Sequence, residues 1–424
     1  MGFDPGTLRT TLETLPATRR YVIGYSGGLD SHVLLQALSR LREDGGVPEL
    51  LAVHVDHGLQ ADAADWARHC ERVCAGLDVS FTAVAVDAEP ETGEAPEAAA
   101  RRARYAALRA LMRPDDILLT AHHRGDQAET VLLQLLRGAG PAGLAAMPVL
   151  AAFTPGWHAR PLLGVGREAL RRYAEHEGLT WIEDPSNTDP RFDRNYLRHG
   201  VMPRLRERWP SAEQTLARAA RHQAQIAALL REFGAEDLER VRGSRDDSLS
   251  VSRLLGLSES RRANTLREWF RRRRMPPPSE AQLERLVSDV LEARDDAEPL
   301  LRLDQLELRR YRDDLYALAP LSPHDPGRVI DWDGRSPLTL DPPGCRIDAA
   351  DLRGLGLDPE RLEGPLTVRF RRGGERCRPS DSSETRELKK LFQEIGMPPW
   401  ERDRVPLIYS GERLVAVIGH WACV

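Results

Sequence analysis

Lysine is almost absent from this chain of 424 residues. Among its 60 basic residues only Lys389 and Lys390 are lysines, so the other 58 are arginines. A Walker phosphate loop needs a lysine in the pattern G-x-x-x-x-G-K-[ST], and no lysine precedes Lys389. The Walker class of nucleotide-binding loop is therefore excluded from the N-terminal part of the chain.

Cysteine and long apolar runs are also scarce. The five cysteines include no CxxC pair and no Cys/His set at zinc spacing, and we expect reduced thiols: Cys70, Cys74, Cys345, Cys377 and Cys423. No run approaches the ~18 apolar residues of a membrane span, and the N-terminus lacks the apolar stretch of a signal peptide. The sequence therefore predicts a cytoplasmic protein.

The composition is that of a folded protein with several domains. Hydrophobic residues make up 41% and charged residues 29% of the chain, and domains of ~150 residues would give about three. The net charge of −5 argues mildly against a polyanionic partner, although an average conceals local patches of arginine.

Strand-like and helical patterns alternate through the first part of the chain. An apolar run at residues 21–24 precedes a helix with leucines on one face, and further strands begin near residues 49, 79 and 116. This alternation predicts an α/β fold with a doubly wound, Rossmann-like parallel sheet over residues 1–210. Helical patterns follow over residues 211–319, with a strand pair near residue 300. A proline-rich linker then leads to a small α+β domain at residues 327–424.

The sharpest motif lies between the first strand and its helix. It reads Ser26-Gly27-Gly28-Leu29-Asp30-Ser31. Glycines let the backbone approach a phosphate, and a helix N-terminus offers free N–H groups and a partial positive charge. We predict that residues 26–31 bind the phosphates of ATP and that Asp30 holds Mg²⁺. A simple glycine turn that begins a helix is the structural alternative.

The SGGxDS motif after a strand resembles that of the N-type ATP pyrophosphatases, or PP-loop family. These enzymes cleave ATP to AMP and pyrophosphate while they adenylate an oxygen of the substrate. Further blocks resemble the bacterial tRNA(Ile)-lysidine synthetases within that family. These blocks are HVDHGLQ (54–60), EAAARRARY (97–105), TAHHRGDQAETVLLQLLRGAGPAGLAAM (120–147), RPLL (160–163), EDPSNTDPRFDRNYLR (183–198) and LKKLFQEIGMPPWERDRVPLIY (388–409).

The resemblance implies a ligase that uses ATP, Mg²⁺ and free L-lysine. Such an enzyme adenylates C2 of the wobble cytidine in tRNA(Ile) with the anticodon CAU and then attaches lysine there. The products are lysidine, AMP and pyrophosphate, and the tRNA then reads AUA. The sequence does not specify a protein partner and leaves open whether the chain forms a homodimer.

Several side chains are candidates for the chemistry that the resemblance implies. Arg101 and Arg104 are three residues apart on a predicted helix, and we expect Arg101 to contact the cytidine adenylate. For Arg104 an exposed helix face paired with Glu97 is an equal alternative. Asp126 and Glu129 are also three apart and would bind the ammonium groups of lysine, although Asp126 is equally suited to cap a helix.

Histidines at strand ends are weaker candidates. His122 and His123 follow a strand, and one of them is expected to contact substrate, with a buried structural role as the alternative. His54, Asp56 and His57 end the second strand, a natural place for adenine or ribose. The family commonly has two consecutive aspartates before QAET, whereas this chain has Gly125 before Asp126. The role of the missing carboxylate would pass to water or to Asp56.

Three arginine-rich runs contrast with the negative total. Residues 191–208, 261–274 and 369–378 carry local charges of +4, +6 and +4. Such charge suits an RNA backbone, and Trp269, Phe270 and Phe370 would add stacking surfaces. A solvated face is the commoner explanation of any single run, but one run in each domain, together with the resemblance, favours an extended surface that contacts tRNA. The predicted tRNA contacts are Asn195, Arg198, Arg271, Arg371, Lys389, Lys390 and Trp400.

Two other functions remain in competition. A tRNA thiolase of the same PP-loop class would also adenylate a base, but such enzymes rely on CxxC cysteines, which Cys70 and Cys74 do not form. A tRNA-binding protein with an inactive site is the second alternative, and Gly125 is the residue that supports it.

Overall fold

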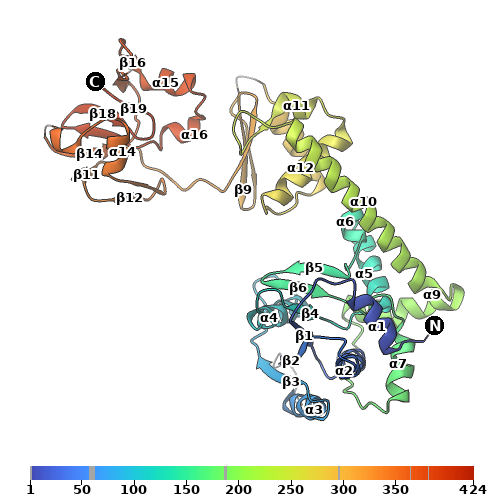
Figure 1. Cartoon of the computed structure of the whole chain (residues 1–424). Helices are drawn as coiled ribbons and strands as arrows, with labels where there is room; N and C mark the ends of the chain where they lie inside the picture. Colours follow the sequence, from blue (N-terminus) through green and yellow to red (C-terminus); the bar gives the residue numbers. More distant parts are fainter. Residues whose placement is uncertain (1, 57–62, 186–188, 295–296, 363, 381) are drawn as a thin grey trace. The chain divides into compact units, whose positions relative to one another are not determined.

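The computed structural model describes residues 2–56, 63–185, 189–294, 297–362, 364–380 and 382–424. Two compact units divide the chain, Met1–Arg231 and Glu232–Val424 (Figure 1). Each unit is described below by itself, as the N-terminal unit and the C-terminal unit.

A six-stranded sheet forms the centre of the N-terminal unit. Its order is β3-β2-β1-β4-β6-β5, and all neighbouring strands are parallel except β5, which is antiparallel to β6. The strands are β1 Arg20–Gly24, β2 Glu49–Asp56, β3 Ser80–Ala85, β4 Ile117–Leu119, β5 Leu150–Phe153 and β6 Gly156–Ala159. The predicted doubly wound parallel sheet is thereby confirmed.

Alternating side chains of the central strands enter two separate apolar clusters. In β1, Tyr21 and Ile23 join the larger cluster, whereas Val22 lies in the smaller one on the opposite face. Because side chains in a strand alternate between faces, both faces of the sheet are covered. Residues of α1 Pro5–Leu12, α2 Leu29–Glu43, α3 Ala63–Gly76 and α7 Arg167–His176 complete the larger cluster, and residues of α4 Pro96–Ala110 the smaller.

The remaining helices of the N-terminal unit follow the sheet strands. α5 (Arg124–Leu136) begins directly after β4, and a π-helical turn at Leu197–Val201 lies between two short helices. The turn lies between α8 (Asp193–Tyr196) and α9 (Met202–Arg208), and another short helix, α6 (Pro141–Leu144), follows α5. The long helix α10 (Ala212–Arg240) continues from this unit into the next (Figure 1).

The first half of the C-terminal unit packs short helices against a small sheet. The sheet has the order β7-β10-β9-β8, with strands β7 Leu249–Ser250, β8 Leu300–Leu303, β9 Leu306–Tyr311 and β10 Asp314–Leu318. The predicted strand pair is thus three consecutive strands. The helices are α11 Val251–Leu255, α12 Glu259–Arg272 and α13 Glu280–Leu286, followed by a π-helical turn at Val287–Leu291.

A five-stranded sheet dominates the second half of this unit, as the short β-like runs predicted. Its order is β11-β14-β17-β18-β19, formed by Ile330–Trp332, Leu366–Arg369, Leu407–Ser410, Arg413–Val417 and Trp421–Ala422. The predicted helix near residue 390 is α15 (Leu388–Glu394), and α16 (Pro399–Arg402) follows it. Smaller elements are α14 Ala349–Gly354, the pair β12 Leu338–Leu340 and β13 Cys345–Ile347, and the pair β15 Arg376–Cys377 and β16 Arg386–Glu387.

The three aromatic side chains expected to stack on RNA bases are buried instead. Trp269 and Phe270 are 5% and 1% exposed within the apolar core of the first half, and Phe370 is 2% exposed in the second. The expectation was wrong because it followed the neighbouring arginines. The apolar residues themselves have the spacing of a helix around Trp269 and Phe270 and of a strand before Phe370. Buried rings of this kind stabilise the core and are closed to a base.

The expectation that all five cysteines are reduced was also wrong, because Cys377 and Cys423 form a disulfide. Their sequence separation of 46 residues gives no hint of it. The fold brings them together because the end of the chain pairs with the segment after β15, where Ser380 N donates to Ala422 O at 3.1 Å. Cys70 and Cys74 are buried free thiols, and Cys345 is a half-buried one.

Reduction of this disulfide should destabilise the C-terminal unit. Closing a loop of 46 residues lowers the entropy of the unfolded chain, worth up to ~4 kcal/mol of unfolding free energy. Denaturant unfolding of the full chain with and without dithiothreitol measures the difference. Cys377→Ser should unfold like the reduced protein and lose its response to reductant, whereas Cys345→Ser should retain that response. Equal midpoints for the oxidised and reduced chains would contradict the prediction.

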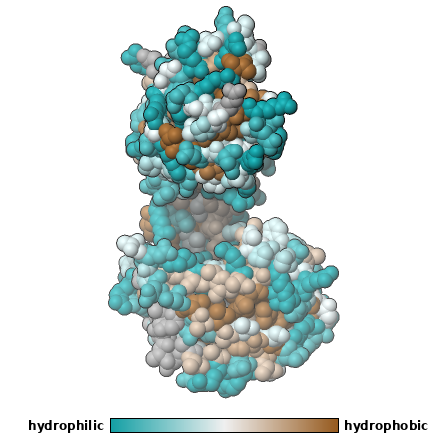
Figure 2. Space-filling view, turned by 90° about the vertical axis from the view of Figure 1, so that its left-hand side faces the viewer, coloured by the Kyte–Doolittle hydropathy of each residue, from teal (hydrophilic) through white to brown (hydrophobic). Residues whose placement is uncertain are grey.

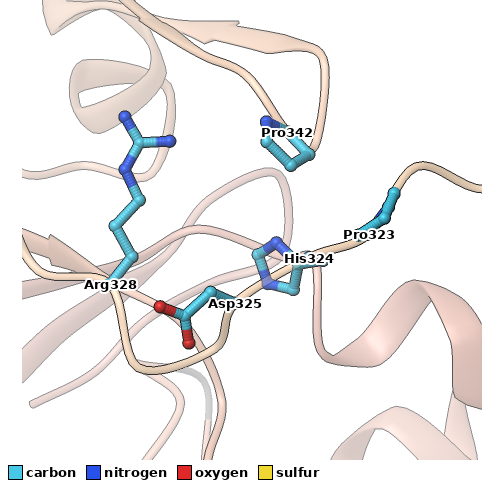
Figure 3. Close-up of a pocket in the computed structure, with 5 residues that line it drawn as sticks. All are labelled: Pro323, His324, Asp325, Arg328 and Pro342. Atoms are coloured by element: carbon cyan, nitrogen blue, oxygen red, sulfur yellow. The ribbon is translucent and has the colours of Figure 1, made fainter.

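Two further surface features complete the description. Figure 2 shows an apolar area on one face of the N-terminal unit, with hydrophilic residues around it. A cavity of about 300 Å³ lies in the C-terminal unit, lined by Pro323, His324, Asp325, Arg328 and Pro342 (Figure 3). The predicted site residues do not include any of these five. None of the helices in the described ranges combines the length and the apolar character that a bilayer span requires.

Candidate active site

The SGGLDS segment forms a compact loop between β1 and α2. Ser26 Oγ and Ser31 Oγ lie 3.0 Å apart, and Ser31 Oγ donates to the carbonyl of Gly28 at 3.0 Å. Gly28 is the N-cap residue of α2 and brings no side chain to cap it. Leu29 is 5% exposed and anchors the loop in the core. The first N–H groups of α2 are therefore available to phosphate oxygens.

Gly27 cannot carry a side chain in this loop. Its φ is +77°, and a Cβ atom there would lie 2.6 Å from Ile182 Cδ1 and 2.9 Å from Cys70 Sγ. The carbonyl of Gly27 also accepts a hydrogen bond from Ile182 N at 2.9 Å. The segment after α7 therefore holds the loop from behind, and only glycine fits at this position.

Asp30, in the first turn of α2, has a carboxylate with one buried oxygen that has no hydrogen-bond partner among the described residues. The other oxygen, Oδ2, lies 3.7 Å from His123 Nε2 and 4.0 Å from Arg167 Nε. Burial raises the pKa of Asp30, and the charges of His123 and Arg167 act against that rise. An unpartnered buried carboxylate oxygen is costly unless something binds it.

This donor set fits a divalent cation in part. Over the described residues, no group of three or more His, Cys, Asp or Glu side chains is arranged to hold a metal ion. Mg²⁺ commonly binds proteins through one or two carboxylates and takes its other ligands from phosphates and water. One oxygen of Asp30 beside the SGGLDS loop is compatible with that mode.

His123 and Asp126 close the N-terminus of α5 as a reciprocal cap. His123 Nδ1 accepts from the backbone N of Gly125 at 3.0 Å and of Asp126 at 3.3 Å, and Asp126 Oδ2 accepts from His123 N at 2.9 Å. Since those backbone groups only donate, His123 Nδ1 is the acceptor in this cap, and its Nε2 faces Asp30. A Cβ atom at Gly125 would lie 2.8 Å from His123 Cε1, so the capping ring occupies the space of a side chain there.

Asp126 also takes part in an ion pair, so it is more than a helix cap. Its Oδ1 accepts from Arg198 at 2.9 Å. Burial alone would raise the pKa of Asp126, but the charges of His123 and His122 and the N–H of His123 outweigh it and lower the pKa to about 2. This carboxylate is ionised throughout the neutral range.

Glu129 is one turn further along α5 and is 3% exposed. Arg198 binds it with two hydrogen bonds of 2.8 Å, and Arg194 Nε lies 3.3 Å from Oε2. Burial lowers the pKa of Arg198, yet its bonds to Glu129 and the nearby carboxylates raise the value overall. The structure thus brings together Asp126, Glu129 and Arg198, which the sequence had assigned to two different substrates.

Arg101 and Arg104 of α4 are both exposed, as the predicted helix face requires. The guanidinium of Arg101 lies over the ring of Tyr105, 5.0 Å from its centre. The charge of Arg104 contributes to lowering the pKa of His54. The side chain of Glu97 lies outside the described residues, so its pairing with Arg104 is not described.

A chain of polar side chains extends inward from the end of β4. His122 Nδ1 lies 2.7 Å from Thr120 Oγ1, which lies 2.8 Å from His158 Nε2. His158 Nδ1 lies 3.1 Å from an Arg160 nitrogen. Burial and the charge of Arg160 lower the pKa of both histidines to about 3, although Asp126 opposes the shift at His122. Both imidazoles are therefore neutral at pH 7.

These two histidines should make the N-terminal unit sensitive to acid. In the unfolded chain each imidazole has a pKa near 6.5, so between pH 6.5 and 3 the unfolded state binds more protons and stability falls as the pH falls. Lowering the pH from 7 to 5 should cost about 2 kcal/mol for each histidine. Urea unfolding at both pH values measures this loss. In His158→Gln the loss should be smaller by about 2 kcal/mol, and an equal loss in that variant would contradict the assignment.

His54 and Asp56 occupy different positions at the end of β2. His54 is 5% exposed, and its Nδ1 lies 3.1 Å from the carbonyl of Tyr25, next to the phosphate loop. Burial lowers the pKa of His54, so the ring is neutral and supports the loop backbone. Asp56 is the last residue of β2 and is half-buried. His57 lies outside the described residues. Contact of His54 and Asp56 with ATP stays a prediction.

The residues predicted to bind tRNA have varied surroundings. In the N-terminal unit, Asn195 is buried and donates to the carbonyl of Asp189 at 2.9 Å. In the C-terminal unit Arg271 pairs with Glu268, and Arg371 Nη1 bonds Asp403 at 2.7 Å. Lys389 and Lys390 are exposed on α15.

Trp400 packs against Tyr311 and Tyr316, at 6.4 Å and 5.4 Å between ring centres. The guanidinium of Arg309 lies 5.2 Å from its ring. The side chain is half-buried, so this aromatic cluster holds α16 against the small sheet. Its role in tRNA binding stays a prediction.

Sequence reasoning missed four side chains of the site, Arg167, Arg194, His158 and Arg160. Arg167 and His123 face Asp30, Arg194 supports Glu129, and the pair His158–Arg160 lies behind His122. The motifs RPLL and EDPSNTDPRFDRNYLR contain Arg160 and Arg194, so the signal was present as a block without a role for each residue.

Family models match three segments of the chain. A model described as PP-loop domain matches residues 7–205. Models described as TilS substrate binding domain and TilS substrate C-terminal domain match residues 249–316 and 366–424. Together they cover the sheet of the N-terminal unit, most of the four-stranded sheet of the C-terminal unit, and four of the five strands of its largest sheet.

Curated relatives are similar over almost the whole length. A tRNA(Ile)-lysidine synthase from Coxiella burnetii is 42% identical over 421 residues, which cover 99% of this chain and 93% of that protein. Another from Alkalilimnicola ehrlichii is 45% identical over 417 residues, 98% of this chain and 92% of that protein. A solved U34-tRNA thiolase, NcsA from Methanococcus maripaludis, has 18% identity and a TM-score of 0.44 over 51% of this chain and 77% of its own.

Proposed function

The chain belongs to the tRNA(Ile)-lysidine synthase family, and from this premise we propose how its residues carry out the reaction. The substrates are ATP, free L-lysine and tRNA(Ile) with the anticodon CAU. The observation that supports the proposal most strongly is the phosphate loop with the unpartnered oxygen of Asp30, next to paired carboxylates on α5.

C2 of cytidine bears a carbonyl oxygen that an amine does not displace by itself. Transfer of the AMP group from ATP to that oxygen makes it a leaving group and releases pyrophosphate. The ε-amine of lysine then forms the new C–N bond, and AMP departs with the oxygen. The site therefore needs a cradle for pyrophosphate, donors near the α-phosphate, and a pocket for lysine.

The loop at residues 26–31 would hold the β- and γ-phosphates at the N-terminus of α2. Asp30 would hold Mg²⁺ through its unpartnered oxygen. That ion, when bound, offsets the negative charge of the phosphates. Arg167, close to Asp30, adds a positive charge at the same place, and the exposed Arg101 would contact the α-phosphate or the cytidine adenylate.

Asp126 and Glu129 would bind lysine through its ammonium groups. Both carboxylates already accept hydrogen bonds from Arg198, so lysine would share or replace that guanidinium. Arg198 bridges the two carboxylates and Arg194 contacts Glu129, but two carboxylates have about eight acceptor positions in all, so some are left for an incoming cation. Arg104 and His122 would border the same pocket and contact the base or its phosphate.

For tRNA we propose that exposed cations of the C-terminal unit bind the backbone away from the anticodon. Lys389 and Lys390 on α15 are the strongest candidates because they are exposed and flexible. Arg271, Arg371 and Trp400 would contribute with the parts of their side chains that their internal contacts leave exposed. Asn195 and Arg198 would shape the anticodon pocket. We place the reaction in the cytoplasm.

A lysine-transfer assay tests the function. The full chain is incubated with ATP, Mg²⁺, radiolabelled lysine and unmodified tRNA(Ile) bearing CAU, and both labelled RNA and released AMP are measured. We expect equal amounts of the two products. A tRNA(Ile) transcript with uridine at the wobble position is the matched control and should accept no label. Release of AMP without labelled RNA would reject lysine as the nucleophile.

The alternative of a tRNA thiolase is disfavoured by the state of two cysteines. Cys70 and Cys74 are buried, and burial raises the pKa of each thiol to about 12. A sulfur carrier has to be reachable and readily ionised, and these thiols are neither.

A further inference from the structure

The hydrogen bonds that connect Arg160 to His122 through His158 and Thr120 run in one direction, because Arg160 at one end can only donate. A guanidinium has five N–H groups and no acceptor, so the 3.1 Å contact requires His158 Nδ1 to accept from Arg160. Arg160 itself is held by a second bond to the carbonyl of Pro148 at 2.9 Å and is 7% exposed. Neutral His158 therefore carries its proton on Nε2.

The hydroxyl of Thr120 links His158 to His122 and sets the direction of the hydrogen bond to His122. His158 Nε2–H donates to Thr120 Oγ1 at 2.8 Å, which leaves the hydroxyl hydrogen free to donate in turn. His122 Nδ1 lies 2.7 Å from the same oxygen and is the acceptor that this hydrogen meets. His122 therefore carries its proton on Nε2, the nitrogen away from the chain.

We propose that Arg160, His158 and Thr120 fix His122 in the Nε2–H tautomer, so that it donates a hydrogen bond to an oxygen of the bound nucleotide. This assignment rests on the proposed function for the identity of the ligand. It gives His122 the role of a neutral donor beside Arg101 and excludes it as the base that takes a proton from lysine. Arg160, His158 and Thr120 are positioning residues.

The surroundings of His122 agree with this role. The charged groups that act on it are Asp126, Arg160, Arg101 and Arg194, of which three are cations that disfavour an imidazolium. Tyr105 and Phe153 pack on His158 at 5.5 Å and 5.8 Å between ring centres and keep its ring in place. A fixed neutral donor costs no reorganisation when negative charge develops on the phosphate oxygens.

The tautomer can be measured without any substrate. The full chain, labelled with ¹⁵N in its 12 histidines, gives long-range proton–nitrogen correlations that distinguish a protonated ring nitrogen from a bare one. Comparison with His122→Gln assigns the His122 signals. At pH 7 we expect a bare Nδ1 and a protonated Nε2 for His122 and His158. A proton on Nδ1 of His122, a mixture of tautomers or a doubly protonated ring would overturn the proposal, whether or not the chain transfers lysine.

Kinetics then separate a donor from a structural ring. His122→Gln retains an N–H group at the reach of Nε2, and His122→Phe keeps the ring shape without it. We expect kcat/KM for AMP formation within about tenfold of the parent for glutamine and lower by about 100-fold for phenylalanine. Equal losses in the two variants, or full activity of His122→Phe, would overturn the role.

Thr120 provides a second pair of variants that leave His122 unaltered. Thr120→Val removes the hydroxyl but keeps the shape, and Thr120→Ser keeps the hydroxyl. We expect a mixed tautomer of His122 and reduced kcat in the valine variant, with both properties retained in the serine variant. An unchanged tautomer in Thr120→Val would show that the hydrogen bonds through Thr120 do not control the tautomer of His122.

Discussion

Asp30→Ala is expected to abolish AMP formation while tRNA affinity stays within a few-fold of the parent. The unpartnered oxygen of Asp30 lies at the N-terminus of α2, where the phosphates of ATP are expected. Loss of a metal-binding carboxylate removes several kcal/mol of transition-state stabilisation, which is at least about 1000-fold in rate. AMP release measured by chromatography, together with tRNA binding by filter retention, checks both parts.

A matched control lies at the other end of α2. Asp44 follows the last residue of α2, is exposed, and pairs with Arg9 at 2.9 Å. Asp44→Ala also removes one carboxylate but should leave AMP formation unchanged. Retained AMP formation in Asp30→Ala would count against Asp30 as the residue that binds Mg²⁺, whereas loss of tRNA binding as well would indicate a folding defect.

Glu129→Gln is expected to lower stability and to prevent lysine transfer. The change leaves Arg198 and Arg194 in a buried site without their main carboxylate, and a broken buried ion pair typically costs about 3–5 kcal/mol of unfolding free energy. Adenylation of the tRNA should persist, because the phosphate loop and Asp30 are unaltered. Urea unfolding measures the first effect, and labelled lysine and labelled ATP measure the second and third.

The control for the stability effect is an exposed ion pair in the same unit. Asp65 and Arg68 are 68% and 65% exposed, so Asp65→Asn should cost at most about 1 kcal/mol. The lysine pocket is tested below the unfolding temperature of the variant. Lysine transfer with an unchanged KM for lysine would show that Glu129 supports the fold but does not bind the substrate.

The α/β fold and the loop conformation of residues 26–31 were predictable because their signals are local. Strand β1, the SGGLDS loop and helix α2 follow one another within 24 residues, from Arg20 to Glu43, and each has its own periodicity or glycine requirement. The carboxylates of α5 were likewise found from their spacing on one helix. What could not be read from the sequence is which cations meet them, since Arg198 lies 69 residues after Glu129.

Counting charge along the chain was less informative for the same reason. The runs at residues 261–274 and 369–378 appear strongly basic, but their partners come from elsewhere in the C-terminal unit. Arg261 bonds Asp237 at 2.9 Å, Arg369 bonds Glu412 at 3.0 Å, and Arg371 bonds Asp403. Electrostatic patches therefore need the fold, because a carboxylate far along the chain neutralises as well as a near one.

The His123 cap of α5 restricts which residue can stand at position 125. The imidazole occupies the space that a Cβ at position 125 would need, with only 2.8 Å between them. A residue with a side chain at position 125 therefore requires the His123 ring, and the two backbone hydrogen bonds that it accepts, to shift. Because the two positions share this space, we expect the effects of substitutions at 123 and 125 on stability to be non-additive.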